Sequence, residues 1–160
     1  MSVRKEFVKL LFDEMEKNSD IYFITGDLGY GHFDHFRDKF GDRFINVGAA
    51  EQLLVGVGIG LAMEGKIPIC YSMTPFVIYR PFEFIRNYIN YENIPVKLIG
   101  AGRNKDYSHD GISHWAEDDE EILSCFKNIK IFKPMSDKEL IENFEEMLYN
   151  NKPCYLNLIR

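Results

Sequence analysis

Residues 43–73 read RFINVGAAEQLLVGVGIGLAMEGKIPICYSM, and this stretch decides the fold. Two short apolar runs, at 43–47 and 67–73, are typical of buried strands. Between them, a turn at Gly48 is followed by an apolar segment long enough for a helix, over 50–63. A strand, a helix and a second strand in this order predict two parallel strands joined by a helical crossover.

The same alternation continues on both sides of this stretch. We expect further strands at 21–24, 96–100, 129–132 and 154–159, and helices at 3–15, 33–40, 75–91, 115–126 and 136–149. Pro81 marks a helix start within 75–91. Ser136 and Glu139 form a capping box, with Met135 and Leu140 as its hydrophobic staple. Because the strands are continuous apolar runs, we predict an α/β fold, a doubly wound, mostly parallel sheet of about six strands with helices on both faces.

Composition limits the classes of function. The 160 residues suit a single domain, 1–160, with its own core. A net charge of −6 argues against nucleic-acid binding, and nothing indicates a role at a membrane surface. The longest apolar run, 53–63, is shorter than the roughly 20 residues that span a bilayer, and the start of the chain has no apolar block typical of a signal peptide. Three scattered cysteines form no disulfide framework or zinc motif. We expect a cytoplasmic protein.

Glu51 is the first candidate site residue, because it follows a predicted strand directly at the start of a helix. A carboxylate there is also favourable simply because the amino end of a helix carries partial positive charge. The same helix contains Gly56, Gly58 and Gly60, at a cost of about 1 kcal/mol each relative to alanine. Close packing in the core and a bound ligand both explain that cost, and the choice stays open here.

Polar residues follow other predicted strands, where parallel sheets bind their ligands. Asp27 lies in the turn Gly26-Asp27-Leu28-Gly29, and an acidic residue there also fits turn chemistry alone. The loop 107–114 carries two histidines, which exchange protons near neutral pH, and it equally fits an exposed polar loop. His32 and His35 bring the number of histidines to four. Their spacing fits no common pattern of metal ligands, so we predict no metal site formed by these side chains.

Taken together, these segments resemble the pyrimidine-binding domain of transketolase-like thiamine diphosphate enzymes. The most specific match runs over 42–52 and continues through 53–56 to 65–68. Further matches follow in order at Pro75-Phe76, Arg80, Glu83, Ile85-Arg86-Asn87 and Asp110-Gly111-Ile112-Ser113-His114. The resemblance covers essentially the whole chain and is closest to the separately encoded C-terminal subunit of split transketolases. It implies the thiamine diphosphate-binding fold.

The resemblance implies a role for each site residue. Glu51 would hydrogen-bond N1′ of the aminopyrimidine, protonated or sharing its proton with the ring, and so activate the cofactor for attack on a ketose carbonyl. Phe76 would stack on the aminopyrimidine, and Asp27 would lie near the cofactor. The substrate contacts would be Asp110 and His114, which read sugar hydroxyls, and Arg80. His114 would also carry a proton.

The resemblance also implies a partner. Enzymes of this kind hold the diphosphate through Mg²⁺ with a Gly-Asp-Gly motif, and neither Gly26-Asp27-Leu28 nor Gly41-Asp42-Arg43 has its second glycine. We therefore expect thiamine diphosphate and Mg²⁺ to bind with a separate chain that carries the diphosphate-binding domain and holds the metal, in a heterotetramer of two copies of each chain. The substrate would be a sugar or sugar phosphate. We expect the usual C-terminal domain to be absent.

Two departures from the split type bear on function. Arg103-Asn104-Lys105-Asp106 stands where a glycine run is usual, and Trp115 where a second histidine is usual, which would change the substrate channel. Three functions remain open: a ketol-transferring subunit, a subunit of a thiamine-dependent 2-oxo acid decarboxylase or dehydrogenase, and a non-catalytic domain that regulates a partner. Segment 110–114 favours sugar chemistry, and a loop at 103–106 that fills the channel would favour regulation.

Overall fold

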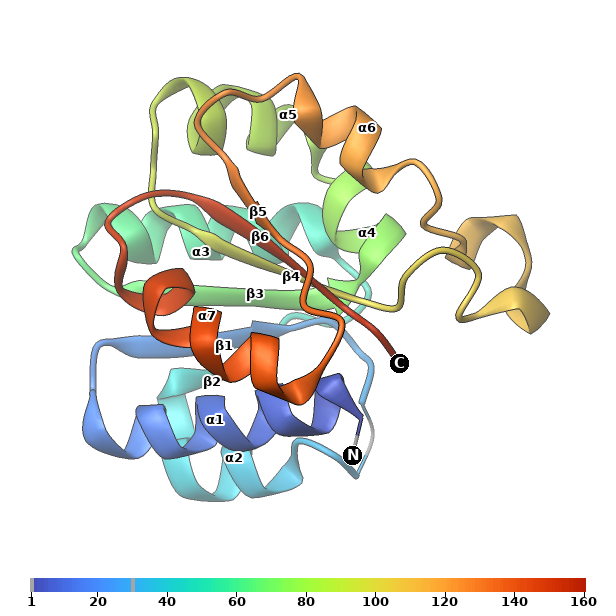
Figure 1. The fold of residues 1–160 in the computed structure, drawn as a ribbon. Helices are drawn as coiled ribbons and strands as arrows, with labels where there is room; N and C mark the ends of the chain where they lie inside the picture. Colours follow the sequence, from blue (N-terminus) through green and yellow to red (C-terminus); the bar gives the residue numbers. More distant parts are fainter. Residues whose placement is uncertain (1, 30) are drawn as a thin grey trace.

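Six parallel strands form the centre of the protein (Figure 1). The structure is a computed structural model that describes residues 2–29 and 31–160. The strand order is β2-β1-β3-β4-β6-β5, and every pair of neighbours runs parallel. The strands are β1 (Ile21–Thr25), β2 (Phe44–Asn46), β3 (Ile67–Met73), β4 (Lys97–Ala101), β5 (Lys130–Phe132) and β6 (Cys154–Leu158). The predicted α/β fold with a parallel sheet of six strands is confirmed.

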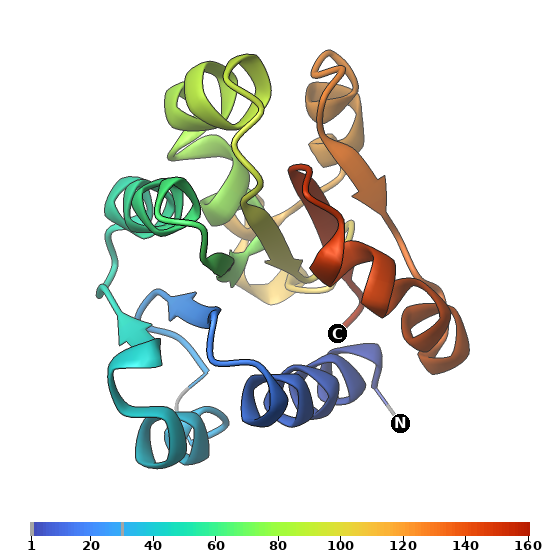
Figure 2. The ribbon, with the colours of Figure 1, turned by 90° about the vertical axis from the view of Figure 1, so that its left-hand side faces the viewer.

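Helices cover both faces of this sheet (Figures 1 and 2). One face carries α1 (Val3–Lys17), α2 (Asp34–Phe40) and α7 (Asp137–Tyr149). The other carries α3 (Glu51–Met63), α4 (Thr74–Tyr79), α5 (Phe82–Phe84), the π-helical η2 (Ile85–Tyr91) and α6 (Asp119–Ser124). Short 3₁₀ turns complete the elements, η1 (Gly41–Arg43), η3 (Ser108–Asp110) and η4 (Ile112–His114). Among the described residues, no helix combines the length and the apolar character needed to cross a membrane.

Each face of the sheet has its own apolar core. Under α1 and α7 the core is rich in aromatic rings, and the Tyr71 ring lies 6.4 Å from that of Phe7 and 5.8 Å from that of Phe23. Under α3 and η2 the core is aliphatic and includes Val55 and Leu98. Because strand side chains alternate between the two faces and both faces are covered, nearly every position of the four inner strands meets a core. This arrangement explains the continuous apolar runs of the sequence.

One predicted helix is confirmed with its interruption, and another begins later than predicted. Segment 75–91 is helical and restarts at Pro81 as predicted, because Pro81 has no N–H to continue α4 and lies just before α5. The helix predicted over 115–126 begins only at Asp119. Before it the chain is extended, and the Ala116 N–H donates to the Asn104 carbonyl at 2.8 Å. The start of α6 is set by the Asp119 carboxylate, which is buried against β6.

The amino end of α7 is capped as predicted, without the predicted staple. The Ser136 hydroxyl accepts from the Glu139 N–H at 3.2 Å. The Glu139 carboxylate in turn accepts from the N–H of Met135 at 2.8 Å. The Met135 side chain is 64% exposed, so the predicted staple with buried Leu140 is wrong.

Close packing accounts for one glycine of α3. A Cβ at Gly58 would lie 2.4 Å from the Cys70 Sγ atom, so only a residue without a side chain lets α3 lie directly on β3. A Cβ at Gly60 would meet nothing within 4 Å. At Gly58, packing of the helix on the sheet therefore answers the question that the sequence left open.

We predict opposite effects for two glycine-to-alanine changes in this helix. Gly58→Ala should lower the free energy of unfolding by about 1–3 kcal/mol, because the new methyl group overpacks the core against Cys70. Gly60→Ala, the matched control, should raise it by about 0.5–1 kcal/mol, because alanine favours the helix and has open space there. Urea unfolding measures both. Equal effects at the two positions would contradict the packing argument.

Candidate functional site

The residues predicted for the site lie beyond the carboxyl ends of the strands. In a parallel sheet the segments that follow the strands meet at one edge. Asp27 follows β1, Glu51 begins α3 after β2, Phe76 and Arg80 belong to the segment after β3, and Asp110 and His114 belong to the loop after β4. The order of the strands, with β1, β3 and β4 adjacent, brings these segments to the same region.

Glu51 is buried at the first turn of α3. Its side chain is 5% exposed, and its Oε1 atom accepts a hydrogen bond from Arg80 Nη1 at 2.8 Å. The amino end of the helix also favours a carboxylate at this position. A buried charge is costly unless it is paired, and Arg80 supplies the pairing from the end of α4.

The Arg80 guanidinium also lies over the ring of Phe76. Its Cζ atom is 3.7 Å from the ring centroid, which is a cation–π contact. The His114 ring meets the Phe76 ring edge-on, with centroids 4.9 Å apart. The structure therefore brings four of the predicted residues into one series of contacts. We call Glu51, Arg80, Phe76 and His114 the Glu51 cluster.

Asp110 is paired with the histidine that precedes it in the chain. Its Oδ2 atom lies 3.2 Å from Nε2 of His109, and both side chains are exposed. His114 instead has its Nδ1 atom 3.0 Å from the Ser113 hydroxyl. Asp110 and His114 thus lie on successive 3₁₀ turns of one loop, and each is engaged with the residue next to it in the chain.

Asp27 is exposed in the loop after β1. The residue before it, Gly26, packs closely against the turn that precedes α3, because a Cβ at Gly26 would lie 3.3 Å from the Gly48 carbonyl oxygen. The backbone at Asp27 therefore lies close to the start of α3, while its carboxylate is open to solvent.

Sequence reasoning missed a buried polar network that fixes the loop carrying Asp110 and His114. At the start of the loop, Arg103 donates from Nε to Asn157 Oδ1 at 2.8 Å and from Nη2 to the Asn157 carbonyl at 2.7 Å. At its end, Asp119 accepts from Asn157 Nδ2 at 2.6 Å. Asn157 therefore holds both ends of the loop. An asparagine within the apolar run of β6 was the signal that could have revealed it.

Tyr155 completes this network. Its hydroxyl donates to Asp119 at 2.6 Å and in turn accepts from Asn157 Nδ2 at 2.8 Å. Burial, with the Asp119 carboxylate beside it, raises the pKa of Tyr155 well above its ordinary value. The phenol therefore keeps its proton and remains a donor to the carboxylate.

The same network shows how the 103–106 loop is held. Arg103 is 6% exposed and points to β6. Lys105 lies on the outside, with its ammonium 4.4 Å from the centre of the Trp115 ring and 3.2 Å from Glu117. The loop sequence that favoured a purely regulatory domain thus has a structural role in anchoring the loop.

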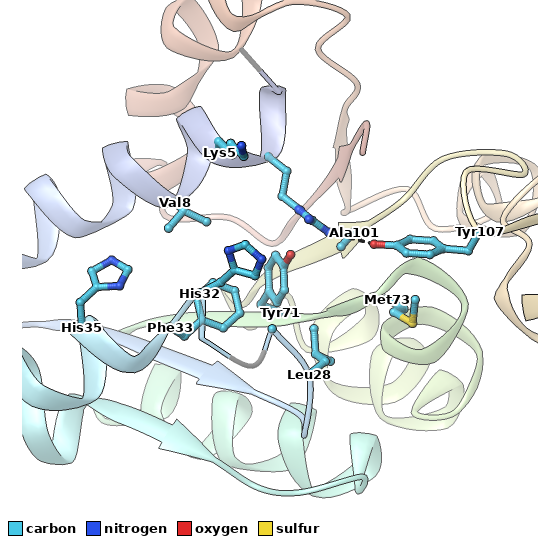
Figure 3. Close-up of a pocket in the computed structure, with 12 residues that line it drawn as sticks. Lys5, Val8, Leu28, His32, Phe33, His35, Tyr71, Met73, Ala101 and Tyr107 are labelled. Atoms are coloured by element: carbon cyan, nitrogen blue, oxygen red, sulfur yellow. Dashed lines mark hydrogen bonds between the residues drawn. The ribbon is translucent and has the colours of Figure 1, made fainter.

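A cavity of about 640 Å³ lies at the same edge of the sheet, on the face that α1 covers (Figure 3). No acidic side chain is among the described residues that line it, and four lining residues are basic, Arg4, Lys5, His32 and His35. Tyr107 also lines the cavity, accepts from Arg4 Nη1 at 2.9 Å, and has its ring 6.5 Å from that of His114. The lining favours an anionic ligand, and Tyr107 connects the cavity to the Glu51 cluster.

Metal ligands do not gather in this chain as the structure describes it. Within residues 2–29 and 31–160, no group of three or more His, Cys, Asp or Glu side chains is arranged to hold a metal ion.

We predict that Asn157→Ala lowers the free energy of unfolding by about 2–4 kcal/mol, because it removes one hydrogen bond from each of the buried charged groups of Arg103 and Asp119. It should also increase hydrogen exchange across 103–118. The control is Asn151→Ala, at an exposed residue before the same strand, which should change stability by less than about 0.5 kcal/mol. Unchanged exchange in the loop of the Asn157 variant would contradict its anchoring role.

Two curated relatives of this chain are both named as transketolase subunits. The chain is 36% identical over 123 residues to one of the subunits of the apulose-4-phosphate transketolase of Actinobacillus succinogenes, covering 77% of this chain and 40% of that protein. It is 28% identical over 159 residues to the 6-deoxy-6-sulfo-D-fructose transketolase subunit SqwH of a Clostridium species. This match covers 99% of this chain and 49% of that protein. The chain thus spans about half the length of these relatives or less.

A solved structure agrees over the full chain. It is described as a split gene transketolase, inactive beta4 tetramer, and it superposes with a TM-score of 0.87 at 29% identity. The alignment covers 100% of this chain and 51% of that one. The family model for the transketolase pyrimidine-binding domain matches residues 1–160. The chain therefore belongs to the transketolase pyrimidine-binding domain family, as the sequence resemblance predicted.

Proposed function

We propose that this chain is the pyrimidine-binding subunit of a two-chain, thiamine diphosphate-dependent transketolase-like enzyme, which transfers a ketol unit between sugars. The observation that carries the proposal is the buried Glu51 carboxylate beside Phe76 at the ligand-binding edge of a parallel sheet. A carboxylate kept only for packing would not need to be buried beside an aromatic face at this edge.

The Glu51 cluster fits the aminopyrimidine half of the cofactor. The cluster already accommodates a flat group that bears N–H donors, because the Arg80 guanidinium stacks on Phe76 and donates to Glu51. An aminopyrimidine has the same planar shape and carries nitrogen atoms that can exchange a hydrogen bond with the carboxyl group.

When bound, thiamine diphosphate supplies a nucleophilic carbon and an electron sink for the transferred unit. Glu51 holds a proton at N1′ of the aminopyrimidine, and Phe76 orients the ring. His114, whose ring touches Phe76, moves a proton at the substrate side. Asp110 and Arg80 would contact the sugar, and Asp27 would lie near the cofactor.

A partner chain completes this proposal. It would carry the diphosphate-binding domain and hold Mg²⁺, with two copies of each chain in a heterotetramer. One observation supports it: both relatives are called subunits.

For the substrate we propose a ketose that carries a terminal anionic group. The names of the two relatives include a sugar phosphate and a sulfonated sugar. In this chain, the basic lining of the cavity beside Tyr107 would suit a phosphate or sulfonate group.

Glu51→Gln should abolish the transfer reaction of the assembled enzyme, with a loss on the order of 10²–10⁴-fold in kcat, because the amide cannot move a proton at N1′. Donor ketose, acceptor aldose and product are followed together, and a 2-oxo acid serves as the alternative donor. Glu64→Gln, at the exposed carboxyl end of the same helix, is the control and should keep full activity. If the assembled enzyme acted on the 2-oxo acid and not on the ketose, the proposal of ketol transfer would be wrong, and decarboxylation would take its place.

Purification of the chain under gentle conditions from its host should recover a stoichiometric partner that contains Gly-Asp-Gly and a downstream asparagine. Adding thiamine diphosphate and Mg²⁺ to the two chains should give activity that neither chain shows alone. Tight cofactor binding and ketose turnover by the 160-residue chain by itself would contradict the two-chain proposal.

A further inference from the structure

Arg80 makes the two contacts that the proposed function gives to the aminopyrimidine. Its Nη1 atom donates to Glu51 at 2.8 Å, and its Cζ atom lies 3.7 Å above the centre of the Phe76 ring. The second distance is ordinary van der Waals contact between stacked planar groups. The same face of Phe76 therefore cannot hold an aminopyrimidine while the guanidinium lies on it.

We propose that Arg80 occupies the aminopyrimidine site in the free chain and that the cofactor displaces it. The inference rests on the proposed function, because it takes Glu51 and Phe76 as the aminopyrimidine site. Cofactor binding and release of the guanidinium are then a single exchange, in which one planar group replaces another on the same two partners.

The structure gives a reason for Arg80 to enter the site. The Glu51 side chain is 5% exposed, and a carboxylate so buried is costly without a partner. Phe76 adds a flat surface on which an arginine side chain stacks well. With the cofactor absent, Arg80 thus satisfies the buried charge and covers the aromatic face.

The structure also shows how Arg80 leaves. Its side chain is 46% exposed, so water can solvate the guanidinium as soon as it swings outward. The cation–π contact is weak at a partly exposed position. The incoming aminopyrimidine would take over the hydrogen bond to Glu51, so that the buried carboxyl group keeps a partner. Meanwhile Gln52 Nε2 donates to the Arg80 carbonyl at 3.5 Å, and Pro81 follows directly, so the side chain can move while the backbone stays in place.

Displacement also reconciles two roles for one residue. The sequence resemblance gives Arg80 a substrate contact, yet in this structure its guanidinium is engaged with Glu51. Once displaced, the guanidinium is free beside Phe76 and His114 to meet an anionic or hydroxyl group of the substrate. The substrate contact would thus become available only after the cofactor has bound.

The test is an NMR titration of the purified 160-residue chain with 4-amino-5-hydroxymethyl-2-methylpyrimidine, the aminopyrimidine half of the cofactor. This probe needs neither the diphosphate nor the partner chain. In the free protein, the δ-methylene protons of Arg80 should show the upfield ring-current shift expected above Phe76. Addition of the probe should move the Phe76 signals and return the Arg80 protons to ordinary positions with the same midpoint.

Three variants test whether Arg80 competes with the probe for the site or has only a structural role. Arg80→Ala removes the competing group and should bind the probe about three- to tenfold more tightly, because the site is no longer occupied for most of the time. Arg80→Lys keeps a charge for Glu51 without a planar face and should give an intermediate affinity. Arg86→Ala changes an exposed arginine outside the site and should leave the affinity unchanged.

The outcomes distinguish this inference from the proposed function. The displacement of Arg80 is wrong if the probe shifts the Phe76 signals while the Arg80 protons keep their upfield shift. It is also wrong if both Arg80 variants bind the probe no more tightly than the wild type. In either case the proposal that Glu51 and Phe76 form the aminopyrimidine site is unaffected. If the probe fails to bind even when Arg80 is alanine or lysine, the aminopyrimidine site itself is wrong, and displacement falls with it.

Discussion

The parallel pairing of all six strands is the constraint on which the rest of this structure depends. It sends every connection back across a face of the sheet, so both faces are covered by helices and most strand positions are apolar. It also collects the segments that follow the strands at one edge. Glu51, Phe76 and His114 come from three different connections, and they approach one another because these connections share that edge.

The sequence was sufficient for the fold, because the fold follows from local pattern, whereas the site residues were named from the resemblance to a family and stay a prediction. Apolar runs locate the strands, and the rule for parallel sheets then assigns their carboxyl ends to ligand binding. The limits of α6 did not follow, since its start depends on hydrogen bonds between Asp119 and residues of β6 that lie far along the chain. The direction of Arg103 depends on the same kind of distant contact.

The contacts between side chains within the site could not be predicted from local sequence pattern either. Nothing in the spacing of Glu51 and Arg80 indicates an ion pair, because 29 residues and a strand separate them. The neighbours of Asp110 and His114 were not predicted either, although these two residues lie close together in the sequence. A 3₁₀ turn places Asp110 beside His109, and a second turn directs His114 toward Phe76.

Because both ends of the 103–119 segment are bonded to Asn157, its exposed middle can vary in sequence while the segment stays in place. The two ends of the segment are fixed to a central strand, while Lys105, His109 and Ile112 lie exposed between them. Substitutions among the exposed residues alter what the loop presents without disturbing the bonds that hold it. The surface that the loop presents at this edge of the sheet can therefore change within one short segment, at little cost to the folding of the sheet below it.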